Sequence, residues 1–150
     1  MQIQSKKLRY ALSVDKSDLT TFEVSQADRK IALAKMDPQT RADTGFAIAN
    51  VTRFAQAQLI ITLPLDIEIL KGVHPGHRII AIERVGCYVP GGRYPLLSAP
   101  IMSIVPAKVA GVDDVIACLA PNAHRALVAG CHLAGGDRIF HHGYAGAGRT

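Results

Sequence analysis

The second half of the chain alternates between apolar runs and turn-rich segments, and this alternation restricts the possible folds more than any other feature. Strand patterns lie at residues 85–89, 112–119 and 137–140, and helix patterns lie at residues 98–110 and from Pro121 and Asn122 to about residue 134. A strand–helix–strand–helix–strand order at this spacing predicts a parallel sheet with right-handed crossovers. The expected fold class is therefore α/β.

The first half has two clear helix starts. Ser25 is followed three residues later by Asp28, which has the form of a capping box and predicts a helix to about residue 36. Asp37 and Pro38 then supply a second cap and a proline at the first helical position. The apolar residues of this second helix recur with a period near 3.6: Phe46 or Ala47, then Ile48, Val51, Ala55 and Leu59.

Less regular segments lie around these helices. A short strand is expected at residues 21–24, a turn at 74–77 and an alternating strand at 77–85. We expect two portions: residues 1–84, which form a helical and strand portion of the first domain, and residues 85–150, which form a truncated, Rossmann-like parallel sheet. The sheet is expected to be incomplete, because three strands leave exposed edges and the final HHGYAGAGRT has no helical period.

Length and composition exclude several classes of protein. With 150 residues, 49% of them hydrophobic, the chain can bury a sizeable core. Its polar beginning and the absence of a membrane-length apolar run predict a cytoplasmic protein without membrane contact. The net charge is +5, but the basic residues are scattered and only 5% of residues are aromatic, which argues against nucleic acid as a partner.

Neither the cysteines nor the histidines form a recognisable reactive site. Cys87, Cys118 and Cys131 include no C-x-x-C pair, so we expect them to act as small buried apolar residues. The six histidines have no zinc-ligand spacing, and no G-x-S-x-G motif is present. From the residues alone we therefore assign no catalytic residue and no metal ligand.

The stretch VGCYVPGGRYP, residues 85–95, permits two interpretations. A glycine pair after a parallel strand lets backbone N–H groups approach a phosphate, and the next helix adds a favourable dipole. Tyr88 at the strand end is suited to stack on a ring or to hydrogen-bond a sugar. The other interpretation is a tight turn with a half-buried tyrosine, followed by a solvated Arg93.

Three longer runs resemble the histidinol dehydrogenase family. They are ADTGFAIANVTRFAQAQ, GHRIIAIERVGCYVPGGRYPLLS and IVPAKVAGVDDVIACLAPN, and the resemblance spans about residues 21–140. It implies a homodimeric, NAD-dependent and zinc-requiring dehydrogenase, which oxidises a small-molecule alcohol, L-histidinol, to L-histidine through the aldehyde. It also implies that residues 85–150 belong to an NAD-binding domain. Tyr88 matches the family tyrosine that contacts NAD, Pro90, Gly91 and Gly92 match the loop beside it, and Ser98 matches a serine near the substrate.

The resemblance also has gaps. The family's catalytic glutamate–histidine pair and its zinc ligands match nothing in this chain, so we expect a fragment that is inactive alone, produced by a frameshift or premature stop. Cys87 and the pair Arg93-Tyr94 resemble a paralogous branch that includes dehydrogenases of sulfonated diols such as sulfopropanediol. A third interpretation is a non-catalytic nucleotide-binding α/β module.

Overall fold

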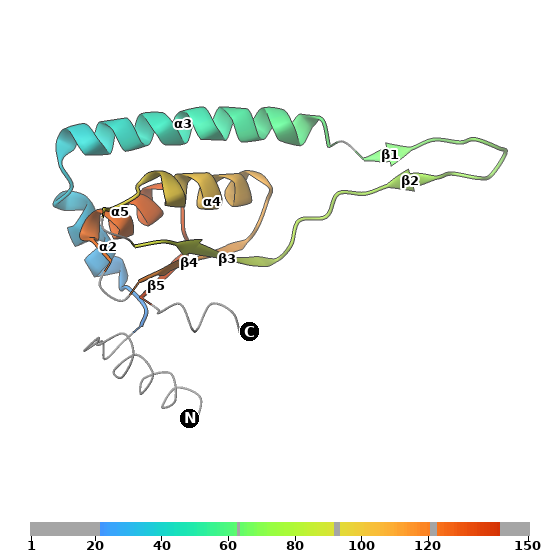
Figure 1. Ribbon diagram of the computed structural model, residues 1–150. Coiled ribbons are helices and arrows are strands. Elements are labelled where there is room, and N and C mark those ends of the chain that lie inside the picture. Colours follow the sequence, from blue (N-terminus) through green and yellow to red (C-terminus); the bar gives the residue numbers. More distant parts are fainter. Residues whose placement is uncertain (1–21, 63, 92–93, 121–122, 142–150) are drawn as a thin grey trace, which may run out of the picture.

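The computed structural model describes residues 22–62, 64–91, 94–120 and 123–141 (Figure 1). Strands β3, β4 and β5 form a parallel sheet in that order, and β1 pairs with β2 in an antiparallel hairpin. The α/β class and the parallel sheet are confirmed. The elements in chain order are α2 (Gln26–Ala34), α3 (Pro38–Ile60), β1 (Leu65–Asp66), β2 (Gly76–His77), β3 (Arg84–Val89), α4 (Ser98–Val109), β4 (Asp114–Leu119), α5 (Arg125–Leu133) and β5 (Arg138–His141).

The two predicted helix starts are confirmed, and each is fixed by a side-chain cap. The hydroxyl of Ser25 accepts a hydrogen bond from the backbone N–H of Asp28 at 3.1 Å. The carboxylate of Asp37 accepts one from the N–H of Thr40 at 2.8 Å, and this bond lowers the pKa of Asp37. Such caps stabilise a helix by about 1 kcal/mol each, because they satisfy N–H groups that the helix leaves without partners.

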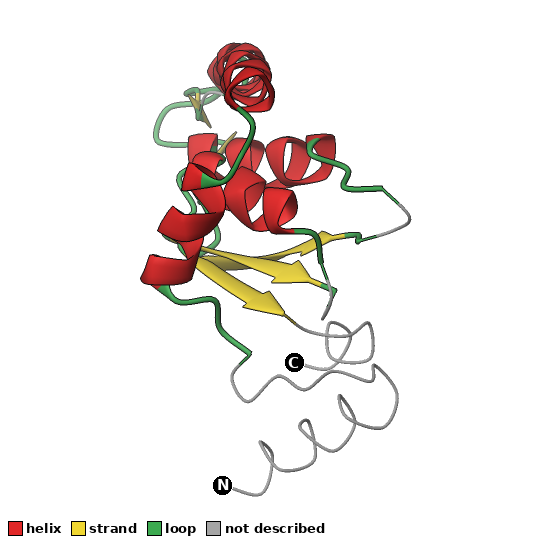
Figure 2. Cartoon of the chain, turned by 90° about the vertical axis from the view of Figure 1, so that its left-hand side faces the viewer, coloured by secondary structure: helices red, strands yellow, loops and turns green. Residues whose placement is uncertain are grey.

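The helices lie on one side of the three-stranded sheet (Figure 2). Helices α4 and α5 pack on the sheet, while α3 packs on α4 and α2 packs on α5. Side chains alternate along each strand, so Cys87 and Val89 of β3 are buried towards the helices and Tyr88 lies on the opposite, open face. The described chain therefore has one covered sheet face and one open sheet face.

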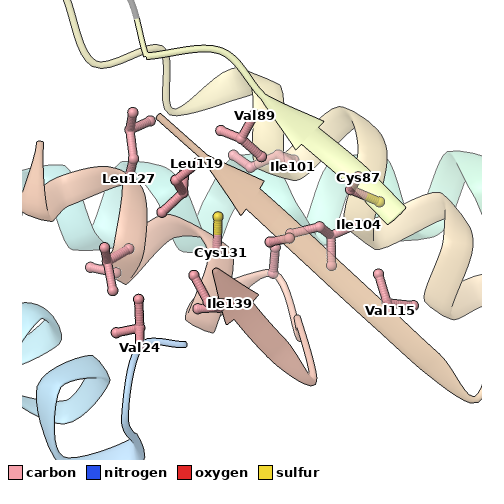
Figure 3. Packing of buried hydrophobic residues seen from close by; sticks show 14 of the residues in the cluster. Val24, Cys87, Val89, Ile101, Ile104, Val115, Leu119, Leu127, Cys131 and Ile139 are labelled. Carbon is pink, nitrogen blue, oxygen red and sulfur yellow. The ribbon is translucent and has the colours of Figure 1, made fainter. Parts of the chain in front are cut away.

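The core lies between the sheet and helices α4 and α5 (Figure 3). Val89, Leu119 and Ile139 from the strands are fully buried, as is Ile104 from α4. Each such side chain contributes about 1.5–3 kcal/mol by its burial. The same apolar cluster includes Val24, Ala32 and Met36 from the first part of the chain. The division at residue 84 into two portions stays a prediction.

The segment before α2 is tied to the far end of the chain. Val24 N–H donates to the Ile139 carbonyl at 2.8 Å, and His141 N–H donates to the Phe22 carbonyl at 2.7 Å. The strand predicted at 21–24 is realised in the described residues as an antiparallel bridge between Glu23 and Phe140. This segment therefore covers the outer edge of β5.

Arg29 of α2 is buried although it carries a charge. It is only 3% exposed, and its guanidinium donates to the Val24 carbonyl at 3.1 Å and to the Asp137 carbonyl at 2.8 Å. One side chain thus joins α2 to the turn that precedes β5. Buried polar groups are tolerated when they are paired in this way.

The segment between α3 and β3 differs from the prediction. The turn predicted at 74–77 is wrong, because the chain reverses at the bridge between Leu70 and Val73, where Gly72 has φ +81°, and Gly76–His77 forms β2. The strand predicted at 77–85 is also wrong over residues 78–83. Ile80 is 77% exposed, so none of the described residues covers the apolar side of this alternating segment at that position.

Helix α5 begins later than predicted. Pro121 and Asn122 lie outside the described residues, and the helix starts at Arg125 with His124 as its N-cap. Nδ1 of His124 accepts a hydrogen bond from the N–H of Ala126 at 3.2 Å. Histidine is not among the usual capping residues, so the sequence contained no conventional signal at this position.

Asp137 makes the stability of the fold depend on pH. Its carboxylate accepts a hydrogen bond from the N–H of Val115 at 2.7 Å and pairs with Lys108 at 2.5 Å. Burial alone would raise its pKa, but these hydrogen bonds outweigh burial and hold the pKa below its ordinary 3.8. A carboxylate with a lowered pKa stabilises the fold above the unfolded-state pKa, and this contribution is lost as pH falls through the folded-state value.

We therefore expect Asp137→Asn to lower the melting temperature at pH 7, with a difference from the unmodified chain that shrinks as the pH falls below about 4. Circular dichroism melts across this range measure the effect. Asp113→Asn, at an exposed neighbouring aspartate, is the control. A gap between Asp137→Asn and the unmodified chain that is constant with pH would contradict the assignment.

Candidate functional site

Tyr88 occupies the position that the pattern predicted, near the carboxyl end of β3. It pairs in register with Cys118 of β4 and is 44% exposed on the open face of the sheet. The fold places it there because Cys87 and Val89 on either side are buried towards α4. An aromatic ring is a residue type that stacks on flat ligands.

The loop after Tyr88 approaches the next strand closely at Gly91. A Cβ atom at Gly91 would lie 3.1 Å from the Cβ of Ala120, which follows the carboxyl end of β4. Pro90 is exposed, and Gly91 forms a bridge with Pro95 that folds the loop back on itself. Gly92 and Arg93 lie outside the described residues. Ligands of open parallel sheets bind at this carboxyl end of the strands, so the loop is in the expected place.

Ser98 is the first residue of α4 and is exposed. The N-cap of this helix is Leu97, which makes no side-chain hydrogen bond to the helix. The helix begins without a polar cap because the preceding turn is closed by backbone bonds, with Leu97 N–H donating to the Pro95 carbonyl at 3.2 Å. The predicted role of Ser98 near a substrate stays a prediction.

A cavity of about 730 Å³ lies elsewhere, where the turn between α2 and α3 faces the beginnings of α4 and α5. None of the predicted site residues that the structure describes lines it. Sequence patterns missed this cavity because its wall comes from three distant segments: residues 32–40, residues 95–97 and residues 123–126. Its wall is mixed in character, with Met36 and Leu97 beside the charged Lys35, Asp37 and Arg125.

The cysteine side chains are not suited to act as nucleophiles. Cys87 and Cys131 are buried, as predicted, whereas Cys118 is only partly buried. Burial raises the pKa of all three thiols and brings that of Cys131 to about 12. The thiolate is the reactive form of cysteine, so these groups stay protonated and unreactive near neutral pH.

Metal ligands are also not gathered at one point in the part of the chain that the structure describes. No group of three or more histidine, cysteine, aspartate or glutamate side chains there is placed to hold an ion. His74 lies 3.1 Å from Asp66 and 3.9 Å from Glu68, but this pair of contacts is on the exposed hairpin. None of the described helices combines the length and apolar character needed to cross a bilayer.

The parallel sheet, covered by helices on one face and followed by a glycine loop at its carboxyl end, defines an α/β protein with its candidate site at the strand ends. The histidinol dehydrogenase family model matches residues 4–147. The chain therefore belongs to the histidinol dehydrogenase family.

Individual relatives agree with this assignment. Histidinol dehydrogenase homolog 1 of Mesorhizobium japonicum is 38% identical over 133 residues, which are 87% of this chain and 27% of the relative. Sulfopropanediol 3-dehydrogenase of Ruegeria pomeroyi is 35% identical over 137 residues, 89% of this chain and 31% of that enzyme. The crystal structure of histidinol dehydrogenase from Elizabethkingia anophelis superposes with a TM-score of 0.86 at 27% identity, covering 95% of this chain and 33% of that chain.

The chain thus spans about a third of the length of the proteins it matches. The fold of this third is that of histidinol dehydrogenase.

Proposed function

We propose that this chain forms part of the NAD-binding site of a histidinol dehydrogenase-like enzyme. The observation that carries the proposal is the exposed ring of Tyr88 on the open sheet face, two residues before the loop at Pro90 and Gly91. The parent enzyme would oxidise L-histidinol to L-histidine through the aldehyde. Its bound NAD would accept the hydride, and the protein's part is to position the cofactor.

The described residues fit a nucleotide at this point. Gly91 lacks a side chain where the loop passes close to Ala120, and this lets the loop lie against the carboxyl ends of the strands. Tyrosine combines an aromatic ring with a polar hydroxyl, a combination that suits a nucleotide with its flat base and its sugar. Gly92 would complete the loop, and Ser98 at the start of α4 would lie near the substrate.

The described residues do not fit zinc. The family enzyme requires an ion, but no set of three possible ligands is brought together here. We therefore derive no step through a metal, and we assign no catalytic residue to this chain. The proposal is that the chain alone is inactive, and that the ion and the acid–base pair belong to parts of a family enzyme that it does not match.

The second candidate is a fragment of a sulfopropanediol dehydrogenase-like enzyme. The specific observation is the 35% identity to the Ruegeria pomeroyi sulfopropanediol 3-dehydrogenase over nearly the whole of this chain. Cys87 and the pair Arg93-Tyr94, which resemble this branch in the sequence, support the same candidate. A non-catalytic nucleotide-binding module is the remaining alternative. We further propose a cytoplasmic location and a homodimeric parent enzyme.

Titration of the purified chain with NAD, with and without zinc, tests the proposal. We expect weak saturable binding, which Tyr88→Ala weakens by about ten-fold because a stacked aromatic contact contributes about 1–1.5 kcal/mol. Tyr94→Ala, at a tyrosine that is 70% exposed, is the matched control.

Turnover assays with L-histidinol and with sulfopropanediol accompany the titration. No turnover of either alcohol is expected. Measurable turnover would contradict the proposed inactivity, and equal NAD binding by both tyrosine variants would remove the assigned role of Tyr88.

A further inference from the structure

Helix α5 begins at a histidine whose ring caps the helix. Nδ1 of His124 accepts a hydrogen bond from the backbone N–H of Ala126 at 3.2 Å. A backbone N–H can only donate, so Nδ1 must carry a free lone pair, and the ring is neutral with its proton on Nε2. The cap of α5 therefore forms in only one protonation state of one side chain.

The other side-chain caps among the described residues respond differently to acid. The hydroxyl of Ser25 keeps its charge, and hydrogen bonds from Thr40 lower the pKa of Asp37. Histidine is the side chain whose charge ordinarily changes between about pH 5 and pH 8. When His124 takes up a proton, both ring nitrogens become donors, and the N–H of Ala126 loses its acceptor. Mild acid is thus expected to remove the cap of α5 and to leave those of α2 and α3.

The groups around His124 do not replace the lost hydrogen bond. The charged or titratable residues in the 730 Å³ cavity and in the hollow beside it are Asp28, Lys35, Asp37, Arg125 and His141. The loop before α4 adds only Pro95 and the apolar Leu97 to the cavity wall. A charged His124 would join the cations Lys35 and Arg125 at a helix end whose dipole is itself positive. The acid on the same wall, Asp37, is already engaged as the cap of α3.

The first turn of α5 also supports the glycine loop. A Cβ atom at Gly91 would lie 3.8 Å from the Cβ of Ala123, the residue before His124. Ala123 N–H donates to the Ala120 carbonyl at 3.0 Å, so this residue joins the end of β4 to the start of the helix. A change at the cap is therefore passed directly to the residue on which the loop lies.

We propose that His124 is a pH-sensitive cap, whose protonation in mild acid releases the first turn of α5 and loosens the contact between Ala123 and the loop at Gly91. The remainder of the helix stays seated, because Leu127 and Cys131 are buried in the apolar core. The device acts on the loop of the candidate nucleotide site but requires no ligand, so its failure would leave the proposed function intact.

Nuclear magnetic resonance of the full, ¹⁵N-labelled chain between about pH 5 and pH 8 tests the cap. The rate at which the amide proton of Ala126 exchanges with water is measured and divided by the rate expected for an unstructured peptide at the same pH. We expect this quotient to rise about five-fold on acidification, the effect of losing a helix cap. The resonance of Gly91 should shift with the same midpoint as the ring of His124.

Three variants separate this cap from other titrating groups. His124→Asn supplies a strong capping residue that takes up no proton, so Ala126 should stay protected throughout the range. His124→Ala has no cap, so exchange at Ala126 should be fast at both ends of the range. His74→Asn, the same change at an exposed histidine of the hairpin, is the matched control and should retain the pH response.

A pH response at Ala126 that persists in His124→Asn would assign it to another group and overturn the proposal. Constant exchange in the unmodified chain would do the same. Loss of protection at Cys131 over the same pH range would mean acid unfolding of the whole fold and not release of one turn, which also contradicts the proposal. A Gly91 resonance that stays fixed while Ala126 responds would overturn the coupling to the loop.

Discussion

Ile104→Ala is expected to lower the free energy of unfolding by about 2–5 kcal/mol. Ile104 is fully buried at the centre of α4, where it packs in the core between the helix and the sheet (Figure 3). The substitution removes apolar contacts and leaves a cavity that tightly packed neighbours fill only in part. Urea unfolding followed by circular dichroism at low protein concentration measures the change.

Met102→Ala is the control for this prediction, because Met102 lies on the same helix and is 66% exposed. It should change stability by no more than about 0.5 kcal/mol. Equal destabilisation by the two substitutions would mean that the helix is stabilised by its own turns and not by its packing on the sheet.

Arg29→Met should destabilise the fold by about 2–6 kcal/mol, since two carbonyls lose a charged donor and each such loss costs about 1–3 kcal/mol. The carbonyls are those of Val24 and Asp137, and both lie close to the sheet. Methionine preserves most of the side-chain volume, so the loss of hydrogen bonds dominates the effect. The same urea experiment measures it.

Lys30→Met gives the matched control, because Lys30 is the next residue of α2, is exposed and loses the same charge. Little change is expected from it. If Arg29→Met proved as stable as Lys30→Met, α2 would be held by apolar contacts alone, and the buried guanidinium would have no measurable part in joining it to the sheet.

The second half of the fold was predictable because its signals are local. Strands 85–89 and 137–140 were placed within about one residue of β3 and β5, and the helix caps at Ser25 and Asp37 are as predicted. The segment around the hairpin was mispredicted. Alternating apolar and polar residues, as at 77–85, form a strand only where another part of the protein covers the apolar side. Whether such a covering part is present depends on the tertiary structure, which a local sequence pattern does not reveal.

The sequence predicted individual residues of the candidate site but not how they are arranged in space. The position of Tyr88 follows from strand periodicity, and the need for glycine at 91 becomes visible only when Ala120 is seen beside it. The cavity beside α2 could not be predicted, because residues 32–40 and 123–126 approach each other only in the folded chain. For the same reason no local pattern predicts the burial of Arg29.

The pairing of residues 22–24 with β5 has a consequence for the order in which the protein assembles. The hydrogen bond from Val24 to Ile139 joins positions at nearly opposite ends of the described chain. During synthesis, residues 22–24 cannot pair until β5 has left the ribosome. Contacts of such long sequence separation form late, because closing the intervening loop has a large entropic cost. Helix α2 is thus made before β5 but reaches its final position only after β5 has formed.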